Sequence, residues 1–127
     1  MPETSLVGRK VLIIEDESLL AMLLEDFLVR IGCEVAGAAS RFNDAMEKAR
    51  SLTFDVAILD VNLNGQKSYP IAEALAARDA PFIFATGYGL ACPPPSLRGA
   101  PLLQKPFKEC DLERALRQAV AAKPEPT

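Results

Sequence analysis

A few polar residues in this chain, each placed directly after an apolar run, carry side chains that bind cations and transfer groups. They are Glu15 and Asp16, then Asp60, Thr86 and Lys105. If these side chains meet, three carboxylates share one small site, and at about 5 Å with an effective dielectric of about 20 each pair repels by roughly 3 kcal/mol. Protonation, the Lys105 ammonium or a divalent cation can relieve that repulsion.

The available ligands indicate which cation and which chemistry would suit such a site. The chain has no histidine and no Cys-x-x-Cys pair, so oxygen ligands favour a hard ion: Mg²⁺, with Mn²⁺ or Ca²⁺ as substitutes. Magnesium commonly takes a substrate phosphate as a further ligand. Asp60 can then attack phosphorus as a carboxylate nucleophile, while Lys105 neutralises phosphoryl oxygens and Thr86 donates a hydrogen bond.

These side chains meet only if parallel strands deliver them to one edge of a sheet. Apolar runs predict five strands, at Lys10–Ile14, Glu34–Ala39, Asp55–Leu59, Pro81–Ala85 and Leu102–Gln104. Apolar residues at three- and four-residue spacing predict helices at Leu19–Ile31, Phe42–Leu52 and Ile71–Ala77, and a last helix marked by Leu112, Leu116, Ala119 and Val120. This alternation is typical of a doubly wound α/β fold, whose strands all end at the same edge.

Length and composition predict one domain over residues 1–127, with a core at about 9–121 and a polar tail at 122–127. The net charge of -3 argues against nucleic acid as the main partner. No apolar run is long enough to insert in a membrane, and the first residues lack a signal peptide, so we expect a cytoplasmic protein. Buried or chance surface thiols, rather than a disulfide framework, are expected for the three cysteines, Cys33, Cys92 and Cys110.

Four motifs occur in order, each at a predicted strand end: IIEDE (Ile13–Glu17), ILDVNLNG (Ile58–Gly65), FATGYG (Phe84–Gly89) and KPF (Lys105–Phe107). Over about residues 9–121 the chain therefore resembles the receiver (REC) domain of two-component response regulators. The resemblance implies a flavodoxin-like (CheY-like) five-stranded parallel sheet with strand order 2-1-3-4-5.

The same resemblance implies roles for the acidic residues. Asp60 would accept a phosphoryl group from a sensor histidine kinase in a Mg²⁺-dependent reaction. Asp16 and Asp60 would bind the metal directly, Asn62 would bind it through its backbone carbonyl, and Glu15 would act through a metal-bound water. The stretch that follows Asp60 also has an ordinary turn composition, Asn62-Leu63-Asn64-Gly65.

The resemblance further implies that Thr86 and Lys105 contact the phosphoryl group, but this chain departs from receivers at the usual switch residue. Receivers typically carry Tyr or Phe three residues before the lysine, where this chain has Leu102. Tyr88 is a candidate substitute, so Thr86 and Tyr88 are the switch candidates. We expect phosphorylation to order the loop at Gly87–Gly99 around Tyr88.

The segment between the fourth and fifth predicted strands contains Pro93-Pro94-Pro95. Each proline removes a backbone donor and clashes with the preceding helical turn. We therefore expect a short or irregular fourth helix there. The usual receiver face formed by the fourth helix, fifth strand and fifth helix would be remodelled, so we expect a monomer or a weak dimer.

The run PFIFATGYG resembles the FAT GUY subgroup of response regulators, which are mostly single-domain proteins of alphaproteobacteria. These proteins are commonly associated with HWE-type or related sensor histidine kinases. Because the chain ends just after the last predicted helix, we expect output through contact with an unidentified downstream protein, or by drawing phosphate from a kinase. No separate substrate turnover is expected.

Three other functions are weighed against this interpretation. A pseudo-receiver, a protein-binding module that is not phosphorylated, would be favoured by missing acids, but all of them are present. A phosphatase of the haloacid dehalogenase class needs two aspartates spaced by one residue, and Asp60-Val61-Asn62 lacks the second. A flavodoxin is disfavoured because no Ser/Thr/Gly phosphate loop follows the first strand and tryptophan is absent.

Overall fold

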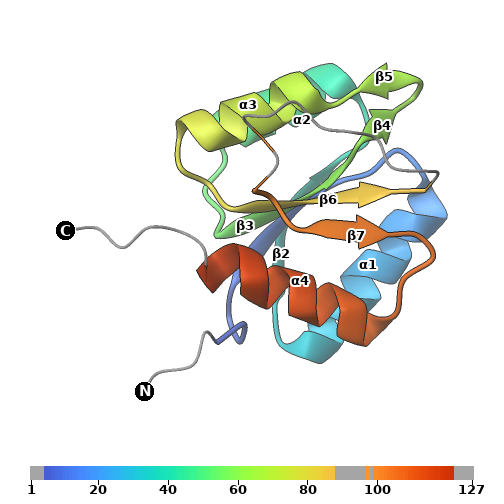
Figure 1. The fold of residues 1–127 in the computed structure, drawn as a ribbon, viewed down its shortest axis with the longest axis vertical. Helices are drawn as coiled ribbons and strands as arrows, with labels where there is room; N and C mark the ends of the chain where they lie inside the picture. Colours follow the sequence, from blue (N-terminus) through green and yellow to red (C-terminus); the bar gives the residue numbers. More distant parts are fainter. Residues whose placement is uncertain (1–4, 88–96, 98, 122–127) are drawn as a thin grey trace.

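The computed structural model describes residues 5–87, 97 and 99–121. Its main element is a five-stranded sheet in the order β2-β1-β3-β6-β7, in which all neighbouring strands are parallel (Figure 1). The strands of this sheet are β1 (Lys10–Ile14), β2 (Glu34–Ala39), β3 (Val56–Asp60), β6 (Phe82–Thr86) and β7 (Leu102–Gln104). Since β6 and β7 are its fourth and fifth strands, the predicted order 2-1-3-4-5 is confirmed.

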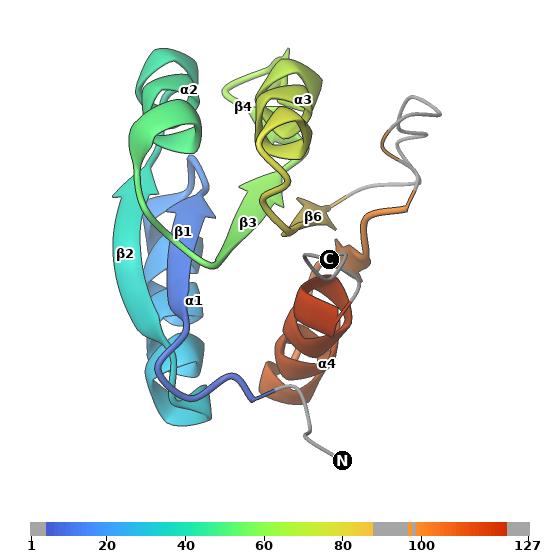
Figure 2. The ribbon, with the colours of Figure 1, turned by 90° about the vertical axis from the view of Figure 1, so that its left-hand side faces the viewer.

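Helices cover both faces of the sheet, as Figure 2 shows. On one face lie α2 (Phe42–Ser51) and α3 (Tyr69–Ala77), and on the other lie α1 (Ser18–Ile31) and α4 (Glu109–Ala121). The middle strand β3 is buried at all five positions. A strand that is apolar on both faces is what a parallel sheet between two helical layers requires.

Alternation along each strand divides the apolar interior into two clusters. Val56 and Ile58 of β3 belong to the cluster under α1 and α4, which we call the α1/α4 core. Ala57 and Leu59 belong to the cluster under α2 and α3, the α2/α3 core. Successive strand residues point to opposite faces of the sheet, so β3 supplies both cores in turn.

A two-stranded antiparallel ribbon was not expected from the sequence. β4 (Asn62–Leu63) pairs with β5 (Gln66–Lys67), directly after β3. The two loop residues both have positive φ, 52° at Asn64 and 84° at Gly65, as the tight hairpin turns that match strand twist require. Asn-Gly is a strong signal for such a hairpin, so the stretch is more than an ordinary turn.

The strands β3 and β6 each begin and end one residue later than predicted. The ladder continues through Asp60, which pairs with Ala85, and through Thr86, which pairs with Gln104. Backbone hydrogen bonds between strands do not depend on side-chain polarity. A strand end predicted from the change to polar residues therefore falls one residue too early.

Several expectations concern residues outside the described part of the chain. Tyr88, Cys92 and the three consecutive prolines lie there, as does the tail at 122–127. The predicted irregular fourth helix and the Tyr88 switch are therefore not tested. Of the other cysteines, Cys33 is buried, Cys110 is exposed, and both are free. Within the described residues, no helix is both long enough and apolar enough to cross a lipid bilayer.

Candidate functional site

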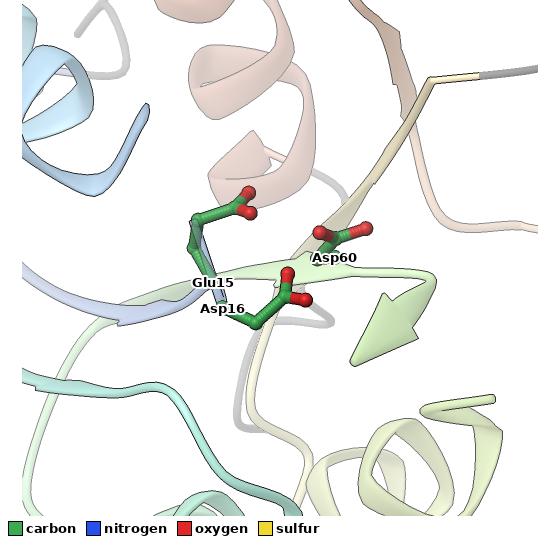
Figure 3. A group of neighbouring side chains, drawn as sticks. All are labelled: Glu15, Asp16 and Asp60. Carbon is green, nitrogen blue, oxygen red and sulfur yellow. The ribbon is translucent and has the colours of Figure 1, made fainter. Parts of the chain in front are cut away.

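The first and third strands bring three carboxylates to the carboxyl edge of the sheet. Glu15 and Asp16 follow β1, and Asp60 is the last residue of β3. The Glu15 backbone N–H donates to the Ala39 carbonyl of β2 at 3.0 Å, which extends the sheet pairing to the site. Each of the three acids offers an oxygen, and these oxygens all lie within 4.8 Å of one another (Figure 3). This is close enough for one small cation to contact several of them.

Lys105, which follows β7, places its ammonium group among these acids. Its Nζ lies 3.1 Å from Asp60 Oδ2, 3.2 Å from Glu15 Oε1 and 3.9 Å from Glu17 Oε1. The Lys105 backbone N–H donates to the Thr86 carbonyl at 2.8 Å, so β6 fixes where this lysine leaves the sheet. One ammonium therefore faces several carboxylates, and the described site retains negative charge for a cation to neutralise.

Glu15 has the most perturbed titration in the site. Burial, followed by the hydrogen bond to Asp60 and the negative charge of Asp60, raises the pKa of Glu15 from 4.5 to about 8. The backbone N–H of Glu17 and the charge of Lys105 oppose this rise. With only 3% of Glu15 exposed, water cannot stabilise its charge. Without a metal, Glu15 therefore holds a proton at neutral pH.

The pKa values of Lys105 and Asp16 move in the directions that keep both groups charged. Burial alone would lower the pKa of Lys105, but the charges and hydrogen bonds of Asp60 and Glu15 outweigh it and raise the value. Burial alone would raise the pKa of Asp16, but hydrogen bonds, led by the backbone N–H of Asn64, outweigh it and lower the value. The site thus contains both a charged ammonium group and an ionised carboxylate.

An open cavity of about 270 Å³ lies at this edge. It is several times the roughly 30 Å³ that one water occupies in the liquid, so a hydrated cation and a phosphoryl group would fit. The cavity is lined by Asp16, Glu17, Asp60, Val61, Asn62, Lys67, Thr86, Gly87 and Lys105. The structure thus brings Asp16, Asp60, Thr86 and Lys105 together, while Glu15 contacts Lys105 and Asp60 from the buried side.

Backbone and hydroxyl groups hold Asp60 in place. The Asn62 backbone N–H donates to Asp60 Oδ1 at 3.1 Å. The Ser68 hydroxyl donates to the Asp60 carbonyl at 2.6 Å, and the Ser68 backbone N–H donates to the Val61 carbonyl at 2.9 Å. Ser68 is completely buried, so these bonds are shielded from water. They fix both the main chain and the side chain of Asp60.

Sequence reasoning missed three residues of this region: Asn64, Lys67 and Ser68. The Asn-Gly dipeptide, which is typical of a hairpin turn, could have pointed to Asn64. A weaker sequence feature could have pointed to Ser68, which stands directly before α3, a position where serine is favoured. No sequence feature points to Lys67, because it reaches the cavity only through the pairing of β5 with β4.

Comparison with known proteins decides the family. The sequence profile of the response regulator receiver domain matches residues 11–117. The chain belongs to the response regulator receiver domain family. Receiver domains are signalling modules that interact with a kinase or a downstream protein and bind Mg²⁺ at an acidic pocket. The cluster of Glu15, Asp16 and Asp60 fits Mg²⁺, because its donors are all carboxylate oxygens.

Solved receiver structures resemble this chain over almost its whole length. SdrG from Sphingomonas melonis is 44% identical, with a TM-score of 0.78, over 89% of this chain and 97% of that one. The receiver domain of the response regulator PhyR from Erythrobacter litoralis is 30% identical, with a TM-score of 0.77, over 95% of this chain and 96% of that one. These structures match the fold at lengths similar to that of the present chain.

Curated relatives match over a smaller share of their own length. The transcriptional regulatory protein PdtaR of Mycobacterium tuberculosis is 34% identical over 119 residues, which cover 91% of this chain and 58% of PdtaR. The chemotaxis protein CheY of Thermotoga maritima is 35% identical over 57 residues, which cover 45% of this chain and 48% of CheY. The chain thus spans about half the length of the curated relatives it matches.

Proposed function

We propose that this receiver domain accepts a phosphoryl group from a sensor histidine kinase onto Asp60, in a Mg²⁺-dependent reaction. The observation that carries the proposal is the arrangement at the cavity: the Asp60 carboxylate lies 3.1 Å from the Lys105 ammonium and within 4.8 Å of the Glu15 and Asp16 oxygens. A nucleophilic carboxylate, a fixed ammonium and a hard-cation site are the groups that phosphoryl transfer to an aspartate needs.

In the proposed reaction, an oxygen of Asp60 forms a bond to phosphorus as the bond between phosphorus and the kinase histidine nitrogen breaks. The electron pair of that bond returns to the imidazole. The Asn62 N–H, which holds Asp60 Oδ1 at 3.1 Å, limits rotation of the carboxylate before attack. The Lys105 ammonium group would then leave the carboxylates and bind a phosphoryl oxygen.

The metal is proposed to bind to Asp16, to Asp60 and to the Asn62 backbone carbonyl, with Glu15 acting through a bound water. When bound, Mg²⁺ would supply positive charge that neutralises the carboxylates and the phosphoryl oxygens together. By offsetting the Asp60 charge, which is one of the causes that raise the pKa of Glu15, the bound cation would favour release of the Glu15 proton.

Thr86 is proposed as the residue that reports phosphorylation. It ends β6, is 5% exposed and lines the cavity beside Lys105. Its hydroxyl can donate to a phosphoryl oxygen, which would draw the end of β6 toward Asp60. We propose that Tyr88, two residues further along the chain, takes part in the switch, because Leu102 is 43% exposed on β7 and has no aromatic ring.

A kinase docking surface is proposed on α1, close to the cavity. Leu19, Met22 and Leu23 are 80%, 63% and 41% exposed, and Leu19 lies one helical turn before the other two. The helix begins two residues after Asp16, so a partner that covers this stripe would reach the phosphorylation site. Clusters of exposed apolar side chains commonly mark protein interfaces.

A solved relative supports phosphorylation rather than simple protein binding. SdrG, 42% identical over 94% of this chain and 99% of that one, has been solved in a BeF3-activated conformation. In BeF3, fluorides stand where a phosphoryl group carries oxygens. Membership of the FAT GUY subgroup and an HWE-type kinase partner also belong to this proposal, and they rest on the PFIFATGYG run. A downstream protein target and a cytoplasmic location are proposed as well.

Intact mass after treatment with acetyl phosphate tests the proposal. We expect a single phosphoryl increment on the wild type that requires Mg²⁺ and is absent from Asp60→Ala. Asp44→Ala is the matched control, because Asp44 is an exposed aspartate on α2, and it should be phosphorylated normally. A folded wild type that binds Mg²⁺ but gains no increment from acetyl phosphate or a histidine kinase would instead favour the unphosphorylated pseudo-receiver.

A further inference from the structure

The loop of the β4–β5 hairpin connects Asp16 of the site to the end of β2. The Asn64 backbone N–H donates to Asp16 Oδ2 at 3.0 Å. The Asn64 side-chain amide donates to the Ser40 carbonyl at 3.2 Å, and Ser40 directly follows β2. One residue thus contacts two segments that are 48 and 24 positions away in the sequence.

The backbone conformation at this position restricts which residue can make both contacts. With φ of 52°, Asn64 lies in the left-handed region, which residues with a Cβ atom rarely adopt apart from asparagine and aspartate. Glycine also adopts it, but has no side chain that could donate to Ser40. An aspartate at this position could not donate from an ionised carboxylate. Asparagine meets both requirements.

We propose that Asn64 is a positioning residue for the Mg²⁺ site: it holds one oxygen of Asp16 so that the other is presented to the cation. This inference rests on the proposed function, because it assigns Asn64 a part in the metal site proposed there. The orienting group is a neutral N–H, so it fixes the carboxylate without cancelling the negative charge that attracts the metal. Lys105 holds Asp60 differently, since its positive charge competes with a cation.

The contact with Ser40 sets the position of the hairpin loop. β4 and β5 are only two residues long, so their own pairing gives the loop little support. The Asn64 amide ties this ribbon to the loop between β2 and α2, and so keeps its own N–H aimed at Asp16.

The test is Mg²⁺ affinity of the full chain, measured by isothermal titration calorimetry for the wild type, Asn64→Ala and Asn64→Gly. Partners that orient metal ligands typically contribute about 10- to 100-fold to affinity, so we expect Asn64→Ala to weaken binding by about 10-fold or more. Asn64→Gly keeps the left-handed turn and the N–H but loses the amide, so its loss should be smaller but measurable.

Asp79→Ala is the matched control. Asp79 also has a left-handed backbone, with φ of 57°, but it follows α3 and precedes β6, at the opposite edge of the sheet from the cavity. Alanine there strains the backbone in the same way, so the unfolding midpoint should fall while Mg²⁺ affinity stays at the wild-type value. Asn64→Ala should lower both.

The outcomes separate this inference from the proposed function. Wild-type Mg²⁺ affinity in both Asn64 variants, or an equal loss of affinity in Asp79→Ala, would overturn the positioning role and leave the proposed function intact. A folded wild type that binds no Mg²⁺ would overturn both. Weaker binding in the Asn64 variants alone, with acetyl phosphate still modifying Asp60 at saturating Mg²⁺, would support both.

Discussion

Replacing Glu15 by glutamine should remove most of the pH dependence of stability that the metal-free protein shows between pH 5 and 8.5. Burial and Asp60 raise the pKa of Glu15 from 4.5 to about 8 in the folded chain. A carboxyl with a higher pKa in the folded state binds more protons there than in the unfolded state. Its contribution to stability is therefore complete below pH 4.5 and is lost as the pH rises through 8.

The size of the effect follows from the same two pKa values. Each pKa unit corresponds to about 1.4 kcal/mol. At pH 7 the folded protein holds a proton that the unfolded chain would have released, which lowers the free energy of unfolding by about 3 kcal/mol relative to a neutral side chain. Above pH 8 the loss approaches about 5 kcal/mol. A loss of this size is a large fraction of the stability of a small domain.

Urea unfolding in EDTA at pH 5.5, 7 and 8.5, followed by circular dichroism, measures the effect. The wild type should lose stability along this series, and Glu15→Gln should lose much less. Glu17→Gln is the control: the Glu17 side chain is 68% exposed and lies 3.9 Å from Lys105, and Glu15 is still present, so the wild-type slope should persist. Parallel curves for the wild type and Glu15→Gln would refute the reasoning.

Three further predictions concern groups around the cavity. Lys105→Met should slow phosphorylation by acetyl phosphate by roughly 100-fold or more, because a charged donor to the transferred group is lost; a wild-type rate in mass-spectrometric time courses would contradict this. Ser68→Ala should lower the free energy of unfolding by about 1–3 kcal/mol, because the buried Asp60 carbonyl loses its 2.6 Å bond; an unchanged urea midpoint would argue against it. Lys67→Gln should raise the acetyl phosphate concentration needed for half-maximal rate, with an effect that fades at high salt. An equal change in Lys10→Gln, which lies at the amino end of β1, would show that Lys67 has no local role.

The sheet could be predicted from the sequence because its central strands are short, uninterrupted apolar runs. A run such as Val56–Leu59, apolar on both faces, suits a strand between two helical layers. The bounds of β1, β2 and β7 agree with the prediction. The ends of β3 and β6 differ from the prediction, because Asp60 and Thr86 still pair in the sheet while they line the cavity.

The candidate site was predictable for the residues whose type carries the chemistry, and much less so for those that act through geometry. Asp60 and Lys105 stand out because each is a charged residue directly after a predicted strand, and charged side chains are rarely buried without a partner. Asn64 acts through a backbone N–H and a left-handed φ, and Ser68 through one short bond to a carbonyl. Such contacts join separate segments of the chain, and they cannot be predicted from periodicity or composition.

The division of the interior into the α1/α4 core and the α2/α3 core affects how sequences that adopt this fold can diverge. Neighbouring residues such as Ile58 and Leu59 pack into separate compartments, so a change of volume on one side has little need of a compensating change on the other. One helical layer can therefore acquire a new surface for a new partner while the opposite layer keeps its packing. The carboxyl edge, where both compartments end, is the part of the molecule that neither change has to disturb.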